Sequence, residues 1–89
     1  MEYEWDPAKA RTNLRKHRVS FADAALALED ARALTVSDPD SSGEQRFVSM
    51  GLDPNGRVLV TVFVPRGRRT RIISSRKASR NERRAYESK

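Results

Sequence analysis

The sequence contains no cysteine and only one histidine, and each scarcity excludes a class of chemistry. Without cysteine there is no disulfide framework, no thiolate nucleophile and no cysteine-based zinc site. Because His17 is the only imidazole, one chain cannot build a histidine-rich metal site or a pair of histidines that act as acid and base. We therefore expect neither a metal ion nor a cofactor.

Long hydrophobic runs are also missing. The longest apolar stretch, around residues 58–64, has the length of a strand and falls far short of the ~20 residues of a membrane span. Residues 1–7 carry acids and no apolar segment of the kind found in secretory signals, so we expect a cytoplasmic protein without membrane contact. A chain of 89 residues is expected to form one domain, residues 1–89, around a modest core.

What the sequence has in excess is positive charge, and this charge is concentrated at one end. Residues 66–89 hold ten Lys and Arg against two acids, a net charge of +8; the whole chain carries +6, so residues 1–65 sum to −2. Such a basic segment is typical of polyanion binders, because each arginine offers a planar fork of donors to a phosphate. A solvated basic face and an acidic protein partner are the alternative interpretations.

Capping signals and hydrophobic periodicity predict three helices, over about 7–17, 21–29 and 80–87. Asp6 as N-cap, followed by Pro7 at the first helical position, marks the start of the first. Ser20 opens a variant capping box for the second, and Ser79 with Glu82 forms a full capping box for the last.

Between the second and third helices the hydrophobic period changes to that of strands, which are expected over 33–36, 46–52, 57–64 and 70–75. The tetrapeptide Asp-Pro-Asn-Gly at 53–56 is a strong hairpin signal. Residues 2–5 are a candidate short strand. Helices first and strands later favour an α+β fold, with two N-terminal helices, an antiparallel four-stranded sheet and a short C-terminal helix.

The segment Asp38-Pro39-Asp40-Ser41-Ser42-Gly43 is similar to the start of a calcium-binding loop, with oxygen-bearing side chains at positions 1, 3 and 5 and glycine at 6. The twelfth position is Ser49 instead of a bidentate glutamate, and Arg46 falls inside the loop. A mobile acidic loop between strands is the better interpretation.

The last predicted strand is the most informative stretch. Strict alternation places Arg69, Arg71 and Ser75 on one side and Ile72 on the other. Arginines in so apolar a strand cost desolvation free energy unless they face solvent or a ligand, which favours a functional interpretation. Arg46 joins them if it lies on the same face of the sheet.

A second polar group lies on the first predicted helix. Lys9, Asn13, Lys16 and His17 are spaced so that they share one helical face. The residues of this face either contact successive phosphates of a nucleic acid or are simply solvated. His17 also falls at the helix C-terminus, where the helix dipole favours positive charge, so a structural role is the alternative for it.

Three blocks of sequence carry a resemblance to a known family: Glu4-Trp5-Asp6-Pro7-Ala8-Lys9 with Asn13-Leu14-Arg15-Lys16-His17, then Val19-Ser20-Phe21, then Arg71-Ile72-Ile73-Ser74-Ser75-Arg76-Lys77-Ala78 with Glu82-Arg83-Arg84-Ala85-Tyr86. Together they resemble the BrnT family of toxins, from near residue 2 to near residue 87. One departure is Arg18, where the family usually has glycine, so the left-handed helix cap expected there stays open.

The resemblance implies a RelE-like fold and a ribonuclease toxin that stops translation. It also implies a BrnA-type antitoxin as partner, which binds and neutralises the toxin and helps to repress the shared operon. Operator DNA would then be contacted only through the antitoxin complex.

The residues themselves are compatible with metal-free attack of a ribose 2′-hydroxyl on its neighbouring phosphate, because RNA carries its own nucleophile. The catalytic candidates are the phosphate-binding Arg46, Arg71 and Arg76, with His17 as a general acid–base. Further candidates for contacts with RNA are Lys9, Lys16, Arg69 and Lys77. Tyr86 and Glu82, one turn apart, are expected to pack the final helix, and Trp5 is expected to belong to the core rather than to stack on bases.

Two other classes of function use the same basic surface. One is a regulator that binds nucleic acid without catalysis, although no helix-turn-helix is evident. The other is a protein-interaction module with an acidic partner.

Overall fold

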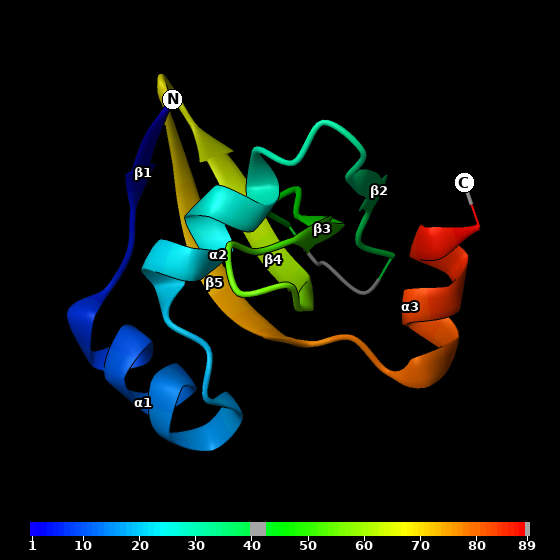
Figure 1. Ribbon diagram of the computed structural model, residues 1–89. Coiled ribbons are helices and arrows are strands. Elements are labelled where there is room, and N and C mark those ends of the chain that lie inside the picture. The colour runs from blue at the N-terminus through cyan, green and yellow to red at the C-terminus, as the bar shows by residue number, and fades with distance from the viewer. Residues whose placement is uncertain (40–42, 89) are drawn as a thin grey trace.

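The computed structural model describes residues 1–39 and 43–88. The elements follow in the order β1 (Glu2–Glu4), α1 (Pro7–His17), α2 (Phe21–Leu28), β2 (Leu34–Ser37), β3 (Phe47–Leu52), β4 (Val58–Arg66), β5 (Arg69–Lys77) and α3 (Arg80–Glu87) (Figure 1). The predicted order is confirmed, with bounds that agree to within two residues. The acidic loop predicted over 38–43 includes residues 40–42, which lie outside the described residues.

The sheet has five strands in the order β1-β5-β4-β3-β2 and is mixed, so the expectation of a four-stranded antiparallel sheet is wrong. Strands β2 to β5 pair antiparallel, whereas β1 runs parallel to β5 at the edge. The pairing sets Glu2 opposite Arg69 and Glu4 opposite Arg71. Opposite charges on paired strands attract, and they help to attach this three-residue strand.

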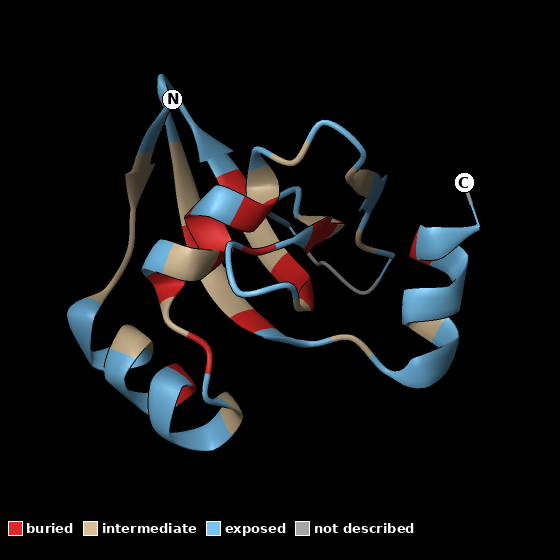
Figure 2. Cartoon of the chain, viewed as in Figure 1, coloured by how far each residue is buried: buried red, intermediate tan, exposed pale blue. Residues whose placement is uncertain are grey.

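Helices α1 and α2 lie on one face of the sheet, and the core lies between α2 and the strands (Figures 1 and 2). Phe21 and Ala24 of α2 are buried against Ile72 of β5. Trp5 packs edge-on against Phe21, with ring centroids 5.9 Å apart, as expected of a core residue. Burying a side chain such as Ile72 stabilises the fold by ~1.5–3 kcal/mol.

Helix α2 approaches β3 closely at Gly51. A Cβ atom there would lie 2.1 Å from the carbonyl oxygen of Ala27, well inside any van der Waals contact. Only glycine leaves room for the backbone of α2 at this distance. The contact places α2 flat on the sheet, so that its small apolar side chains reach the core.

Arg18 ends α1 in the left-handed conformation, with φ 59° and ψ 31°, although it is not glycine. Its N–H donates to Leu14 O, and its own carbonyl accepts from Arg57 Nη1 at 2.8 Å. The Arg57 guanidinium is held in turn by the buried carboxylate of Asp53, 2.8 Å from Nη2. The β3–β4 turn therefore supports the backbone conformation that glycine usually provides.

The predicted helix caps form, with one difference. The side chain of Asp6 accepts from Ala8 N, and Ser79 with Glu82 makes the reciprocal capping box. Ser20 accepts from Asp23 N, but the Asp23 carboxylate pairs with Arg57 at 3.2 Å, so no reciprocal bond to the Ser20 backbone is seen among the described residues.

Candidate active site

A register shift in the β4–β5 ladder decides which side chains of β5 lie together. Val62 pairs with Ser74, but the next residue of β4, Phe63, pairs with Ile72, so Ile73 is an extra residue in β5. Such a β-bulge reverses the alternation of side chains beyond it. The bulge therefore changes the face on which every later residue of β5 lies.

The strict alternation predicted from the sequence is confirmed for Arg69, Arg71 and Ile72 and is wrong beyond the bulge for this reason. Arg71 pairs with Val64 and Arg76 with Val60, two residues four apart on β4, and paired residues share a face of the sheet. Arg71 and Arg76 consequently lie on one face, opposite α1 and α2, which we call the open face. Ser75, expected beside Arg71, pairs with Thr61 and is buried on the helix side.

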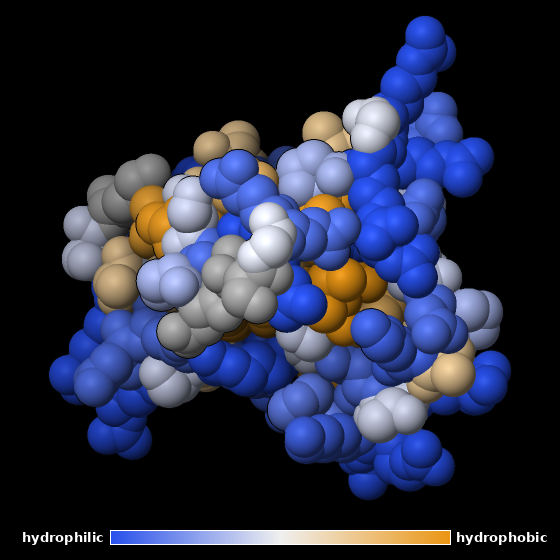
Figure 3. Space-filling view, turned by 180° about the vertical axis from the view of Figure 1, so that it is seen from behind, coloured by the Kyte–Doolittle hydropathy of each residue, from blue (hydrophilic) through white to orange (hydrophobic). Residues whose placement is uncertain are grey.

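The open face is mixed in character. Figure 3 looks at it directly and shows hydrophobic atoms at its centre with hydrophilic ones around them. The half-buried Arg71 and the exposed Arg76 both come from β5, next to the valines of β4. Val60 and Val64, the partners of these arginines, are themselves buried, so the charged side chains are what this part of the face offers to a ligand.

Arg71 is held by β1. Its Nη1 lies 2.8 Å from Glu4 Oε2, and both side chains are about a quarter exposed. The hydrogen bond from Arg71 holds the pKa of Glu4 below its ordinary value. Arg69 makes longer contacts at the solvent-exposed edge, 3.5 Å to Glu2 and 3.7 Å to Glu4. Arg71 is thus the better ordered of the two.

Arg76 is held by α3. Its Nη1 and Nη2 lie 2.8 Å and 2.9 Å from the two carboxylate oxygens of Glu82, a bidentate ion pair. The bonds from Arg76, and next the backbone N–H of Ser79, lower the pKa of Glu82 from 4.5 to about 2. Glu82 is therefore ionised at any pH at which the protein works.

Helix α1 is fastened to β5 by one buried amide. Asn13 Nδ2 donates to Ser75 O at 2.8 Å and to Val19 O at 3.0 Å, while Ser75 N donates to Asn13 Oδ1 at 3.1 Å. Asn13 takes the place of a neighbouring strand where the pairing of β1 has already ended. Its role is structural, and it is not part of a solvated polar face.

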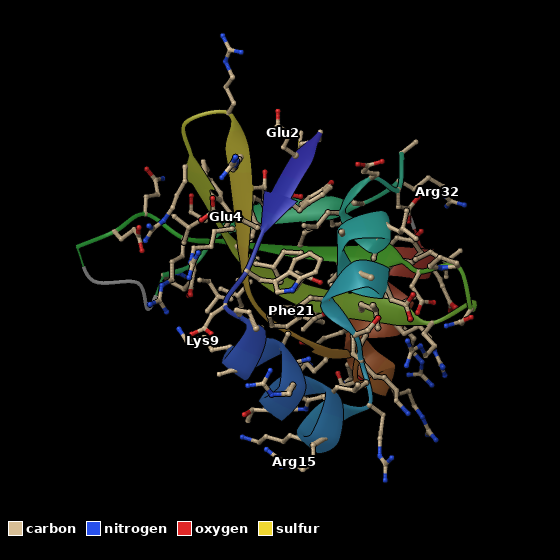
Figure 4. The ribbon with its side chains drawn as sticks, turned by 90° about the vertical axis from the view of Figure 1, so that its left-hand side faces the viewer. Glu2, Glu4, Lys9, Arg15, Phe21 and Arg32 are labelled. Carbon is tan, nitrogen blue, oxygen red and sulfur yellow. The ribbon has the colours of Figure 1, made fainter. Side chains whose placement is uncertain are left out.

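A groove runs between α1 and the bulge of β5. Its volume is about 330 Å³, and it is lined by Ala8, Lys9, Thr12, Asn13, Lys16, His17, Ile73 and Ser74. We call it the α1–β5 groove. Figure 4 shows Lys9 and Glu4 on the side of the molecule away from Phe21 and α2, which is the side of the open face. The groove thus combines basic side chains with the hydroxyl of Ser74, which the bulge places on the face of Arg71 and Arg76.

The structure places six of the predicted site residues in two neighbouring regions, the α1–β5 groove and the open face. Lys9, Lys16 and the half-buried His17 line the groove, and Arg69, Arg71 and Arg76 lie on the open face.

Of the two other predicted residues, Lys77 lies on the opposite face, and Arg46 is separated from β5 by one strand. Lys77 pairs with Leu59, whose side chain packs against α2, so it lies on the helix side. Arg46 is exposed and directly precedes Phe47 of β3, which pairs with Phe63 of β4, the partner of Ile72 in β5. About 10 Å therefore separates its backbone from β5, compared with about 13 Å along the strand between the β4 partners of Arg71 and Arg76.

Thr12 and Ser74 line the groove but were not predicted. The helical period places Thr12 one turn from Lys9 and Lys16, so the sequence could have predicted that it lies on the same face. Nothing local in the sequence shows that Ser74 and Arg76 share a face with Arg71, because that depends on the bulge. Among residues 1–39 and 43–88, no three His or carboxylate side chains gather in a way that could hold a metal ion.

A basic groove beside arginines on an α+β scaffold is the arrangement of a protein that handles a polyanion. A family model described as the ribonuclease toxin BrnT of type II toxin–antitoxin systems matches residues 5–82, and the chain belongs to this family. It is therefore a ribonuclease toxin, with RNA as substrate and an antitoxin as partner.

A solved structure is consistent with this assignment. The crystal structure of the Brucella abortus ribonuclease toxin BrnT is 28% identical in sequence and superposes with a TM-score of 0.67, covering 90% of this chain and 99% of that one. A search of curated protein sequences finds no match. No helix in the described part of the chain is long and apolar enough to cross a membrane.

Proposed function

We propose that the RNA backbone binds along the α1–β5 groove and that Arg71 and Arg76 hold the scissile phosphate on the open face. Lys9 and Lys16 then contact neighbouring phosphates, with Arg69 at the edge. Arg46 completes the phosphate site only if its long side chain reaches across β4, the one strand between β3 and β5.

The cleavage step needs no metal ion. The ribose 2′-oxygen attacks the adjacent phosphorus and loses its proton, while the bond from phosphorus to the 5′-oxygen breaks and that oxygen gains a proton. His17 is the imidazole that lines the groove, and imidazole is the side chain that most often carries out such transfers. Each well-aimed donor to the phosphoryl oxygens contributes ~2–4 kcal/mol to stabilising the transition state.

The observation that supports this proposal best is the bulge at Ile73. It places Arg71, Ser74 and Arg76 on one face, and Ser74 also lines the groove that holds His17. Ser74 thus connects the face of the two proposed phosphate-binding arginines with the groove that the imidazole of His17 lines, which supports the proposal.

The test is to incubate the protein with a single-stranded RNA in excess EDTA and to identify the ends of the products. We expect undiminished cleavage that yields 5′-hydroxyl and 2′,3′-cyclic phosphate ends. A duplex DNA of the same sequence serves as a control and should stay intact. Loss of activity with chelator, or products with 3′-hydroxyl ends, would contradict the mechanism.

The biological setting that we propose follows from the family. The toxin acts as a single RelE-like domain in the cytoplasm, and cleavage of RNA stops translation. Its partner is a BrnA-type antitoxin, and operator DNA is contacted only by the complex of the two.

A further inference from the structure

The ion pair between Arg76 and Glu82 leaves part of the guanidinium available. Nη1 donates to Glu82 Oε1 and, at 3.3 Å, to the carbonyl oxygen of Lys77; Nη2 donates to Glu82 Oε2. A guanidinium has five N–H groups. Within the described part of the chain, Nε–H and the second N–H of Nη2 have no hydrogen-bond acceptor.

These two remaining donors lie on the same edge of the planar guanidinium. Glu82 occupies the end formed by Nη1 and Nη2, so the side edge formed by Nε and Nη2 stays open. That edge matches two oxygens of a phosphate, which arginine binds in bidentate fashion. Glu82 therefore leaves the phosphate-binding edge of Arg76 free while it fixes the plane of the group.

Glu82 is itself held from several sides. Its Oε1 accepts from Ser79 N at 2.8 Å, and Glu82 N donates to Ser79 Oγ at 3.2 Å, so the carboxylate is tied to the first turn of α3. The far end of α3 is anchored by a hydrogen bond from the buried Tyr86 to the carboxylate of Asp30. The position of the Glu82 carboxylate is thus determined by α3 as a whole.

We propose that Glu82 is a positioning residue of this ribonuclease, which orients the guanidinium of Arg76 so that its free edge meets the scissile phosphate. The inference rests on the proposed function of Arg76. It assigns α3 a part in the active site, as the support of Glu82, although α3 lines no part of the groove.

The variant that tests the proposal is Glu82→Gln. Glutamine retains an acceptor for the capping box and a similar shape, so α3 should stay folded. It loses the charge and one of the two acceptors for Arg76. We expect kcat to fall by ~10-fold or more, since a mis-oriented donor stabilises the transition state poorly. KM should stay unchanged or decrease, because the net positive charge of the site rises.

Glu87→Gln is the matched control. It removes the same charge from the exposed end of the same helix, away from Arg76, and should leave kcat unchanged. A merely structural effect of Glu82→Gln would appear as loss of helical circular dichroism at the assay temperature, and not as a drop in kcat at constant KM in a variant that is still folded.

Arg76→Ala distinguishes the positioning role of Glu82 from the proposed role of Arg76 in binding phosphate. If this variant is impaired and Glu82→Gln behaves like the wild-type protein, or if Glu82→Gln raises kcat, the positioning role is wrong and the proposed site stands. If Arg76→Ala keeps wild-type kcat, Arg76 is not part of the site, and the assignment of Glu82 fails with it.

Discussion

At the scale of residues, the arginines on the open face carry the proposed chemistry. Replacing Arg71 or Arg76 by Ala should lower the cleavage rate by ~10²-fold or more, because a phosphate contact contributes to the transition state and little to packing. The measurement is the initial rate on a single-stranded RNA, with circular dichroism to confirm the fold.

Arg84→Ala provides the comparison for these variants. It removes one positive charge from an exposed position of α3, so it reports the general effect of charge on RNA binding. If Arg71→Ala and Arg76→Ala cleave as fast as Arg84→Ala, the arginines of β5 do not hold the scissile phosphate.

The same residues predict a dependence of stability on pH. Arg76 lowers the pKa of Glu82 from 4.5 to about 2 in the folded protein. The ion pair therefore stabilises the fold above pH 4.5, and this contribution is lost as pH falls from about 4.5 through about 2. We expect the wild-type protein to melt at a higher temperature than Glu82→Gln at pH 6, and the difference to shrink towards zero near pH 2. Calorimetry across this range checks it; a difference independent of pH would mean that the charge of Glu82 is not involved.

At the scale of elements, Asn13 decides how α1 sits on β5. Asn13→Ala leaves Ser75 N–H and two buried carbonyl groups without their partner. Since a buried polar group left unpaired costs ~1–3 kcal/mol, we expect the free energy of unfolding to fall by about 3 kcal/mol. Urea denaturation measures this change. Arg15→Ala, on the exposed side of the same helix, should change stability by less than ~0.5 kcal/mol.

Cleavage by Asn13→Ala should fall as well, because α1 carries Lys9, Lys16 and His17 to the groove. A variant as stable as Arg15→Ala would show that the contacts of the Asn13 amide are replaced, for example by water.

The elements that could be predicted are those with local signals. The start of α1 at Asp6-Pro7 and the capping box of α3 could both be predicted, because capping depends on residues within one turn. The parallel pairing of β1 with β5 could not be predicted, since it joins residues 67 positions apart. Its one signal was charge: Glu2 and Glu4 alternate with the same period as Arg69 and Arg71.

The candidate site was predicted in part for the same reason. The residue types and the basic face of α1 follow from composition and helical period, so Lys9, Lys16 and His17 were correctly placed on one helical face, the face that lines the groove. The faces of β5 were assigned correctly for Arg69, Arg71 and Ile72 and wrongly for Ser75, because an extra residue at position 73 is a property of the β4–β5 pairing and not of the β5 sequence alone.

At the scale of the whole molecule, several of the arginines that give the sequence its positive charge are paired with carboxylates. Arg66, Arg69, Arg71 and Arg76 each contact a glutamate in the folded protein. The carboxylates order these arginines in the absence of RNA. RNA then binds to side chains that are already oriented, so less conformational entropy is lost on binding.

Neutralisation by the antitoxin should exploit this same charge distribution, because residues 66–89 carry a net charge of +8. We predict that the antitoxin presents acidic side chains to β5 and α3 and so competes with RNA. Exposed ion pairs are screened over ~8 Å at physiological ionic strength, so added salt should slow association. Dissociation should change little, because buried apolar contacts hold the formed complex. Stopped-flow or surface plasmon resonance measurements over a salt series test this. An association rate indifferent to salt, with β5 and α3 still open to solvent in the complex, would place neutralisation on another surface.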